Sequence, residues 1–249
     1  MADGTVSRSS RGHRTICLPV SEDAYVRAVR DLLVRAGARR IAVLGGAGGT
    51  LATMLMKRGA EACVLVDVDP DAFAVARDYF WLAPTVECVV ADAREFLERC
   101  GRRPAERAFD AIVLDAYDQD GRLPPHLADA RFFRLARRCL APDGLLIANV
   151  FAEHREEESL PDVLGAGIAA AGLPATIVDD EPPAAEDQPG GSRDRNVLVI
   201  GGPFREAWLP LPVDGPAGVW AYEERFRHCR SPRPLPPAAG AATGLTLPA

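Results

Sequence analysis

Short apolar runs alternate with amphipathic stretches along most of the chain. The runs are rich in Val, Ile and Leu, which is typical of parallel strands covered on both faces, and they occupy 41–44, 63–66, 86–91, 109–114 and 145–151. Apolar residues at helical spacing fill the stretches at 22–36, 51–58, 70–80, 93–99 and 129–140. The alternation predicts one α/β domain, with helices on both faces of a mostly parallel sheet.

The pattern changes towards the C-terminus. A helix is predicted over 159–171, and the strands at 175–178 and 196–200 follow with no helix between them, so they should form an antiparallel hairpin. Five strand-and-helix units followed by a hairpin resemble the Rossmann-like class I methyltransferase fold. That fold has a mostly parallel seven-stranded sheet into which the last strand inserts antiparallel, and the right-handed crossover rule sets the rest of its topology.

The two ends of the chain differ from the middle in composition. Residues 1–13 are rich in Ser, Gly and Arg, and residues 230–249 are rich in Pro and Ala, so both are predicted to be disordered. We expect one domain over 14–229, with a short helical extension before the first strand. Within it, Pro142-Asp143-Gly144 predicts a turn, and 219–226 predicts a short closing helix.

The most informative stretch follows the first strand. Residues 45–49 read GGAGG, which lets the backbone turn sharply and lets a ligand approach the main chain. A phosphate-binding P-loop is excluded, because Thr50 follows with no lysine, and the dinucleotide fingerprint needs Gly or Ala where Leu51 stands, so NAD is disfavoured. S-adenosylmethionine or a related nucleoside fits better, while a glycine turn that binds nothing remains an alternative.

Acidic residues stand at the ends of the next two predicted strands. Asp67 ends the second strand about twenty residues beyond the glycines, where a carboxylate accepts hydrogen bonds from both ribose hydroxyls. Asp92 follows the third strand and can accept a hydrogen bond from an adenine amino group, with the Ala93 amide facing the ring. Asp92 and Glu95 also have the spacing of a capping box, so a plain helix cap is an equal alternative.

The fourth strand ends in a second pair of acids. Asp115 and Asp118 flank Tyr117 on a turn that should lie where the sulfonium carbon of such a cofactor points. Asp115 can orient an amine and accept its proton, and the Tyr117 ring can face the sulfonium or simply pack. Asp118 is a second amine-handling acid or a solvated turn residue, and His126 lines the acceptor pocket or is exposed.

Composition limits the partners. The net charge of −6 and the absence of a basic stripe argue against nucleic acid, and no apolar run is long enough to span a membrane. Six cysteines without a CxxC pair and an N-terminus without a secretory signal predict a cytoplasmic protein with reduced thiols. No metal site is predicted, because His, Cys, Asp and Glu show no ligand spacing. We expect a small-molecule acceptor and a possible homodimer.

Several motifs in order resemble the spermidine synthase-like, or polyamine aminopropyltransferase-like, branch of class I S-adenosylmethionine-dependent enzymes. They are LGGAGGT at 44–50, VDVDP at 66–70, ADAREFL at 91–97, LDAYD at 114–118, PPHLADARFF at 124–133 and LAPDGLLIANVF at 140–151. The resemblance implies a transferase with S-adenosyl-L-methionine, or its decarboxylated form, as cofactor. It also implies the cofactor-binding residues Gly45, Gly46, Ala47, Gly48, Asp67, Val68, Asp92, Ala93 and Asp115, and the amine-handling residues Asp115 and Asp118.

Two features depart from that family. Aminopropyltransferases usually have an Asp in the glycine loop where Ala47 stands, and an acid there would repel the carboxylate of the intact cofactor. A small β domain usually precedes the loop in that family, whereas only about forty residues, mostly one predicted helix where they fold, precede it in this sequence. Both departures favour methyl transfer to a small acceptor, with an amine as one option. Aminopropyl transfer from the decarboxylated cofactor is the alternative reaction, and a non-catalytic nucleoside-binding protein is a second alternative.

Overall fold

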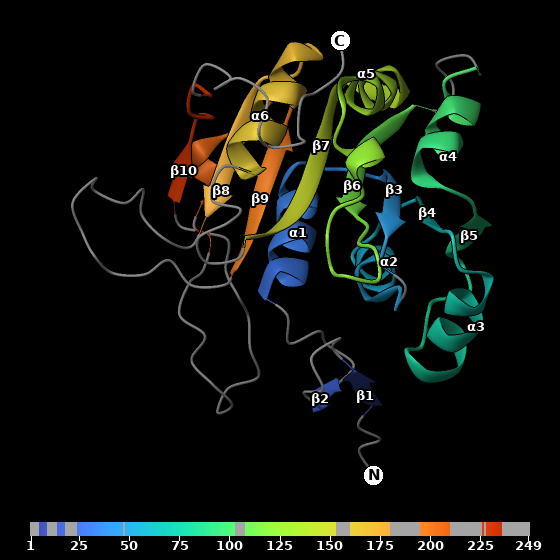
Figure 1. The fold of residues 1–249 in the computed structure, drawn as a ribbon. Helices are drawn as coiled ribbons and strands as arrows, with labels where there is room; N and C mark the ends of the chain where they lie inside the picture. The colour runs from blue at the N-terminus through green and yellow to red at the C-terminus, as the bar shows by residue number, and fades with distance from the viewer. Residues whose placement is uncertain are drawn as a thin grey trace.

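The computed structural model describes residues 5–8, 14–17, 24–46, 48–102, 108–152, 160–179, 195–209, 226 and 228–235. Its main sheet, within these residues, has eight strands in the order β10-β8-β9-β7-β6-β3-β4-β5 (Figure 1). The strands are β3 (Arg40–Gly45), β4 (Ala62–Asp67), β5 (Glu87–Val90), β6 (Phe109–Asp115), β7 (Leu140–Ala152), β8 (Ala175–Asp179), β9 (Arg195–Gly201) and β10 (His228–Arg230). Neighbours among β3 to β7 pair in parallel, whereas β9 is antiparallel to β7 and β8. The predicted fold class and its C-terminal hairpin are confirmed.

Six helices among the described residues cover the two faces of this sheet (Figure 1). One face packs against α1 (Ala24–Arg35), α2 (Thr50–Lys57) and α3 (Pro70–Tyr79), and the other against α4 (Ala93–Cys100), α5 (Ala130–Cys139) and α6 (Leu160–Ala170). Successive residues of β6 alternate between the faces, so that Ile112 belongs to the core under α4 to α6 and Val113 to the core under α1 to α3. Both are fully buried, as a parallel strand covered on both sides requires.

The helices begin where their local sequence predicts. Asp69 accepts a hydrogen bond from the Asp71 amide and Pro70 occupies the first helical position, which together start α3. Asp92 accepts from two amides at the start of α4, and Asp129 accepts from the Phe132 amide at the start of α5.

Three local expectations differ from the structure. A strand, β1 (Thr5–Arg8), lies inside the segment predicted to be disordered and pairs with β2 (Arg14–Cys17). The predicted turn at 142–144 takes the form of a bulge within β7: Leu140 pairs with Phe109, the next pair is Leu145 with Ala111, and the residues between them pair with none of β6.

The third difference is β10, which adds an eighth strand at the edge beyond β8. Most of the predicted closing helix at 219–226 and the end of the Pro/Ala-rich tail lie outside the described residues. None of the helices described in the structure combines the length and apolar character that a membrane span requires.

Candidate active site

The strand register brings the predicted ligand-binding segments to one end of the sheet. Gly45 at the end of β3 pairs with Asp115 at the end of β6. Ala91, which follows β5, donates its amide to the Asp67 carbonyl over 2.9 Å, so that Asp92 starts beside the end of β4. The carboxyl ends of these strands therefore form the edge at which ligands bind open parallel sheets.

The glycine loop requires glycine for measurable reasons. Gly45 has a φ of 84°, and a Cβ there would lie 2.4 Å from the Asp115 carbonyl oxygen. Gly49 has a φ of 63°, and its Cβ would lie 2.5 Å from Leu82 Cδ1. Only glycine combines this backbone conformation with such close approach, so the loop packs directly on the end of β6 at one side and on the core at the other.

The middle of the loop faces the same edge. Gly46 has a φ of 87°, and a Cβ there would lie 3.7 Å from Asp115 Oδ2. Gly48 lies beside Phe80, and a Cβ added at Gly48 would lie 3.8 Å from the Phe80 ring. Ala47 lies outside the described residues, so the structure leaves its predicted contact with a cofactor untested.

Asp67 and Val68 present opposite chemistries at the end of β4. Asp67 Oδ1 accepts a hydrogen bond of 3.0 Å from the Asp69 amide, which fixes the carboxylate at the mouth of the strand end. Val68 is 66% exposed, which is unusual for a β-branched residue next to a core strand. A hydrogen-bond acceptor next to an exposed apolar side chain is suited to a nucleoside, because the carboxylate can bind the ribose hydroxyls and the apolar side chain can pack on the flat base.

Asp92 belongs to a hydrogen-bonded network between α4, α5 and the short 3-10 helix η2 (Pro125–Leu127). Its Oδ1 caps α4, whereas its Oδ2 lies 2.7 Å from Nε2 of His126. Arg94 donates from Nη2 both to the His126 carbonyl oxygen and to the Asp129 carboxylate. The network fixes η2 against the start of α4.

The network also changes the acidity of Asp92. Burial alone would raise the pKa of this carboxyl, but the hydrogen bonds from His126 and from the amides of Glu95 and Arg94 outweigh it and lower the pKa below its ordinary value. Asp92 is thus an ionised acceptor at neutral pH. Ala93 follows as the first residue of α4, a position where the amide has no acceptor within the helix.

Asp115 is surrounded by donors from distant parts of the chain. Its Oδ2 accepts a hydrogen bond of 3.3 Å from the Tyr25 hydroxyl of α1, and its Oδ1 accepts one of 2.9 Å from Asn149 Nδ2 of β7. The Tyr117 hydroxyl donates to the Asn149 carbonyl oxygen over 2.8 Å, which ties the turn after β6 to the neighbouring strand. The arrangement holds a carboxylate in a defined rotamer beside Gly45.

Asp118 has a different environment. Its Oδ1 accepts hydrogen bonds from the Asp120 and Arg122 amides, at 2.9 and 3.0 Å, and its own amide donates to the Arg122 carbonyl oxygen. Asp118 therefore organises the loop after β6, as an Asx-turn residue does. That role is compatible with a second one in binding an amine through Oδ2.

Sequence reasoning missed Tyr25 and Asn149. Tyr25 and Asp115 are 90 positions apart, so no local pattern relates them. Asn149 did carry a signal, since it is a lone amide in the apolar run 145–151. His126 is exposed, which was one of its two predicted alternatives, and it contacts Asp92 at the predicted base-binding side.

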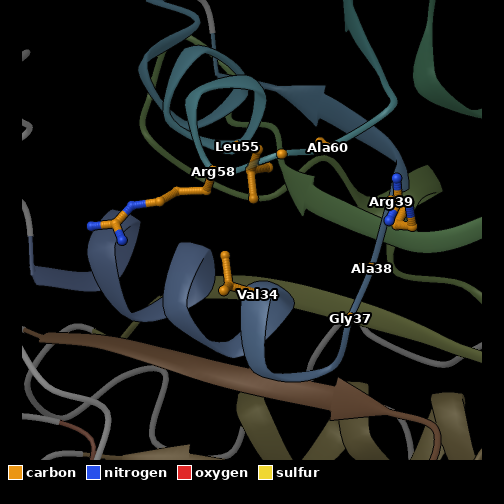
Figure 2. Close-up of a pocket in the computed structure, with 8 residues that line it drawn as sticks. Val34, Gly37, Ala38, Arg39, Leu55, Arg58 and Ala60 are labelled. Carbon is orange, nitrogen blue, oxygen red and sulfur yellow. The ribbon is translucent and has the colours of Figure 1, made fainter.

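A cavity of about 160 Å³ lies at the other end of the strands (Figure 2). Val34 of α1 and Leu55 of α2 face it, together with Ala38 before β3 and Ala60 before β4. These positions precede the strands, whereas the glycine loop and the acids follow them. The cavity is therefore separate from the candidate site.

Comparison with known proteins identifies the family. Residues 27–164, more than half of the chain, match the family model described as "Spermine/spermidine synthase domain". The chain belongs to the spermine/spermidine synthase family. The matched region includes the strand ends of the candidate site and Asn149, whereas Tyr25 lies two residues before it begins.

Curated relatives of the spermine/spermidine synthase family resemble part of the chain. The polyamine aminopropyltransferase of Mycobacterium tuberculosis (strain ATCC 25618 / H37Rv) is 35% identical over 134 residues, which is 51% of this chain and 25% of that protein. The polyamine aminopropyltransferase of Synechococcus sp. (strain JA-2-3B'a(2-13)) is 36% identical over 133 residues, or 49% of this chain and 41% of that protein. The chain thus spans less than half the length of these relatives.

Solved structures confirm the fold. A probable spermidine synthase from Corynebacterium glutamicum ATCC 13032 aligns with a TM-score of 0.60 at 24% identity, covering 76% of this chain and 68% of that one. Human methyltransferase-like protein 13 aligns with a TM-score of 0.54 at 18% identity, covering 71% and 79%. At these identities the likeness establishes the shared Rossmann-like fold.

Proposed function

We propose that this chain is an aminopropyltransferase domain that uses decarboxylated S-adenosylmethionine as donor and an amine as acceptor. The observation that carries the proposal is the carboxylate of Asp115, held between Tyr25 and Asn149 beside Gly45. Family membership and the names of the curated relatives support this reaction, which the sequence offered as the alternative. They do not support methyl transfer, the reaction favoured by Ala47 and the short N-terminal segment.

The residues at the strand ends fit the donor. The backbone of Gly45, Gly46 and Gly48 permits close approach, and Asp67 can accept hydrogen bonds from the ribose hydroxyls. Val68 offers an exposed apolar surface to the base. Asp92, ionised by its hydrogen bonds, can accept from the adenine amino group, and Ala93 can donate its amide to the ring. When bound, the donor supplies a carbon activated by its sulfonium.

Asp115 would align and deprotonate the acceptor. The transfer is an in-line displacement, so the chain must hold the amine nitrogen opposite the leaving sulfur and must keep its lone pair available. A carboxylate is a weak base towards a free ammonium group. The nitrogen becomes more acidic as its bond to carbon forms, however, so proton transfer to Asp115 is favourable in the transition state. Asp118 and Tyr117 would shape the rest of the acceptor site.

Calorimetric titration tests the donor assignment. The purified chain is titrated with decarboxylated and with intact S-adenosylmethionine, and the Asp67→Ala and Asp71→Ala variants are treated alike. Asp71 is an exposed residue of the first turn of α3 and serves as the control. We expect the decarboxylated form to bind more tightly, Asp67→Ala to abolish binding, and Asp71→Ala to leave it unchanged. Preferential binding of the intact form would favour methyl transfer, and binding of neither would contradict the proposal.

A further inference from the structure

The cavity between α1 and α2 lies outside the candidate site and is built from two similar turns. It is found where both helices end and where β3 and β4 begin (Figure 2). A Gly-Ala pair follows each helix, Gly37-Ala38 after α1 and Gly59-Ala60 after α2, and both pairs line the cavity. A Cβ added at either glycine would meet no atom within 4 Å. The space therefore exists because small residues form both turns.

The walls of the cavity are apolar. Val34 of α1 and Leu55 of α2 point into it from opposite sides (Figure 2). Leu55 is 2% exposed, whereas Val34 is 44% exposed, so an occupant would remove the apolar surface of Val34 from water. A volume of about 160 Å³ suits an apolar body of about the size of one benzene ring. The cavity is therefore too small for a nucleoside and fits a compact molecule.

The main-chain amides of the two turns are already paired. Those of residues 36–38 donate to carbonyl oxygens of α1, and those of residues 58–60 donate to carbonyl oxygens of α2. The Arg39 amide donates to the Asp110 carboxylate over 2.9 Å. A bound molecule with acceptor atoms must therefore pair with side-chain donors, and the side-chain donors that line the cavity are Arg39 and Arg58.

The two arginines differ in charge balance. Arg39 Nη2 lies 2.6 Å from Glu61 Oε1, so the charge of Arg39 is compensated. Arg58 is exposed, and its guanidinium makes no hydrogen bond or ion pair with any residue that the structure describes. In Figure 2 this guanidinium extends along the rim of the cavity, and because the side chain is exposed it can turn over the opening without breaking a contact.

We propose that this cavity binds a small monocarboxylate with a compact apolar body, such as an aromatic acid. The apolar body packs between Val34 and Leu55, and the carboxylate accepts two parallel hydrogen bonds from the Arg58 guanidinium. One negative charge matches the one uncompensated guanidinium at the rim, whereas a neutral molecule leaves that charge unpaired. The proposal does not rest on the proposed function, because the cavity and the glycine loop lie at opposite ends of the strands.

Nuclear magnetic resonance of the Val34 and Leu55 methyl groups tests the site directly. The full chain is titrated with benzoate and, separately, with benzamide, which has the same shape but no charge. Benzoate should shift both methyl signals in a saturable way. Benzamide should bind at least about tenfold more weakly, because it cannot form the charged pair with Arg58. Saturation with decarboxylated S-adenosylmethionine should leave the affinity for benzoate unchanged.

Three variants test how the molecule is held. Arg58→Gln should weaken benzoate binding about tenfold and leave benzamide binding unchanged. Val34→Phe should abolish the binding of both, as reported by the Leu55 methyls, because the larger side chain fills the cavity. Arg99→Gln is the matched control. Arg99 is an exposed arginine in the last turn of α4, so it shares the position of Arg58 at a helix end but does not line the cavity, and its loss should change neither affinity.

Four results would overturn the proposal. They are methyl signals that do not move at about 10 mM benzoate, equal affinities for benzoate and benzamide, equal losses in Arg58→Gln and Arg99→Gln, and competition between benzoate and the donor. The comparison of benzoate with benzamide uses the wild type, so it does not depend on a variant being folded. None of these results bears on the proposed function, which donor binding and product analysis test separately.

Discussion

Replacing Gly45 with alanine should disturb both stability and donor binding. Gly45 has a φ of 84°, where an L-residue costs about 1–2 kcal/mol. The added Cβ would also lie 2.4 Å from the Asp115 carbonyl oxygen and 2.6 Å from the Ala116 Cα, both backbone atoms that cannot rotate away. Overpacking of this kind costs about 1–3 kcal/mol. Together the two effects should lower the free energy of unfolding by about 2–5 kcal/mol.

Gly172 provides a matched control for the strain. Its φ of 86° is nearly the same, but an added Cβ meets no atom within 4 Å. Gly172→Ala should therefore cost only the conformational part, about 1–2 kcal/mol. Urea unfolding followed by circular dichroism gives both values, and calorimetry gives donor affinity. Gly45→Ala should weaken donor binding because the contact displaces the end of β6, whereas Gly172→Ala should not. Equal destabilisation by the two substitutions would refute the close packing of the glycine loop on β6.

Three further predictions concern other parts of the molecule. Asp92→Asn keeps the helix cap but loses the charge, so it should lower the free energy of unfolding at pH 7. Because the native pKa of Asp92 is lowered, this deficit should shrink as the pH falls below about 4, and an equal deficit at pH 3 would contradict it. Burial raises the pKa of the Cys63 thiol to about 12. Iodoacetamide at pH 8 should therefore label Cys63 in the native protein far more slowly than the part-exposed Cys88, and similar labelling rates would refute this. Asp162 is 5% exposed and accepts two hydrogen bonds from Arg230, so Asp162→Ala should cost about 2–3 kcal/mol in urea unfolding, and a cost below about 0.5 kcal/mol would contradict the contact.

Local signals predicted β3 to β9 and most helix starts correctly. The apolar run before Gly45 became β3, and Asp69 with Pro70 started α3, because burial on both faces and helix capping act over a few residues. The turn predicted at 142–144 became a bulge within β7. Its Pro-Asp-Gly sequence favours a turn locally, and pairing of Leu140 with Phe109 before it and of Leu145 with Ala111 after it keeps the segment inside the strand.

The candidate site was predictable in part. The acids at strand ends follow from topology alone, since parallel strands bring Asp67 and Asp115 to one edge. The partners of Asp115 were not predictable, because Tyr25 and Asn149 reach it from α1 and β7 by side-chain packing. The same limit applies to His126, whose bond to Asp92 depends on how η2 sits against α4.

Identification of the transferred group tests the central proposal most directly. The chain is incubated with a primary diamine and either decarboxylated or intact S-adenosylmethionine, and the products are measured by mass spectrometry, with Asp115→Asn as the matched variant. We predict that the wild type adds an aminopropyl group from the decarboxylated donor and that Asp115→Asn loses most of this activity. A methylated product from the intact donor, with no aminopropyl product, would contradict the proposed function.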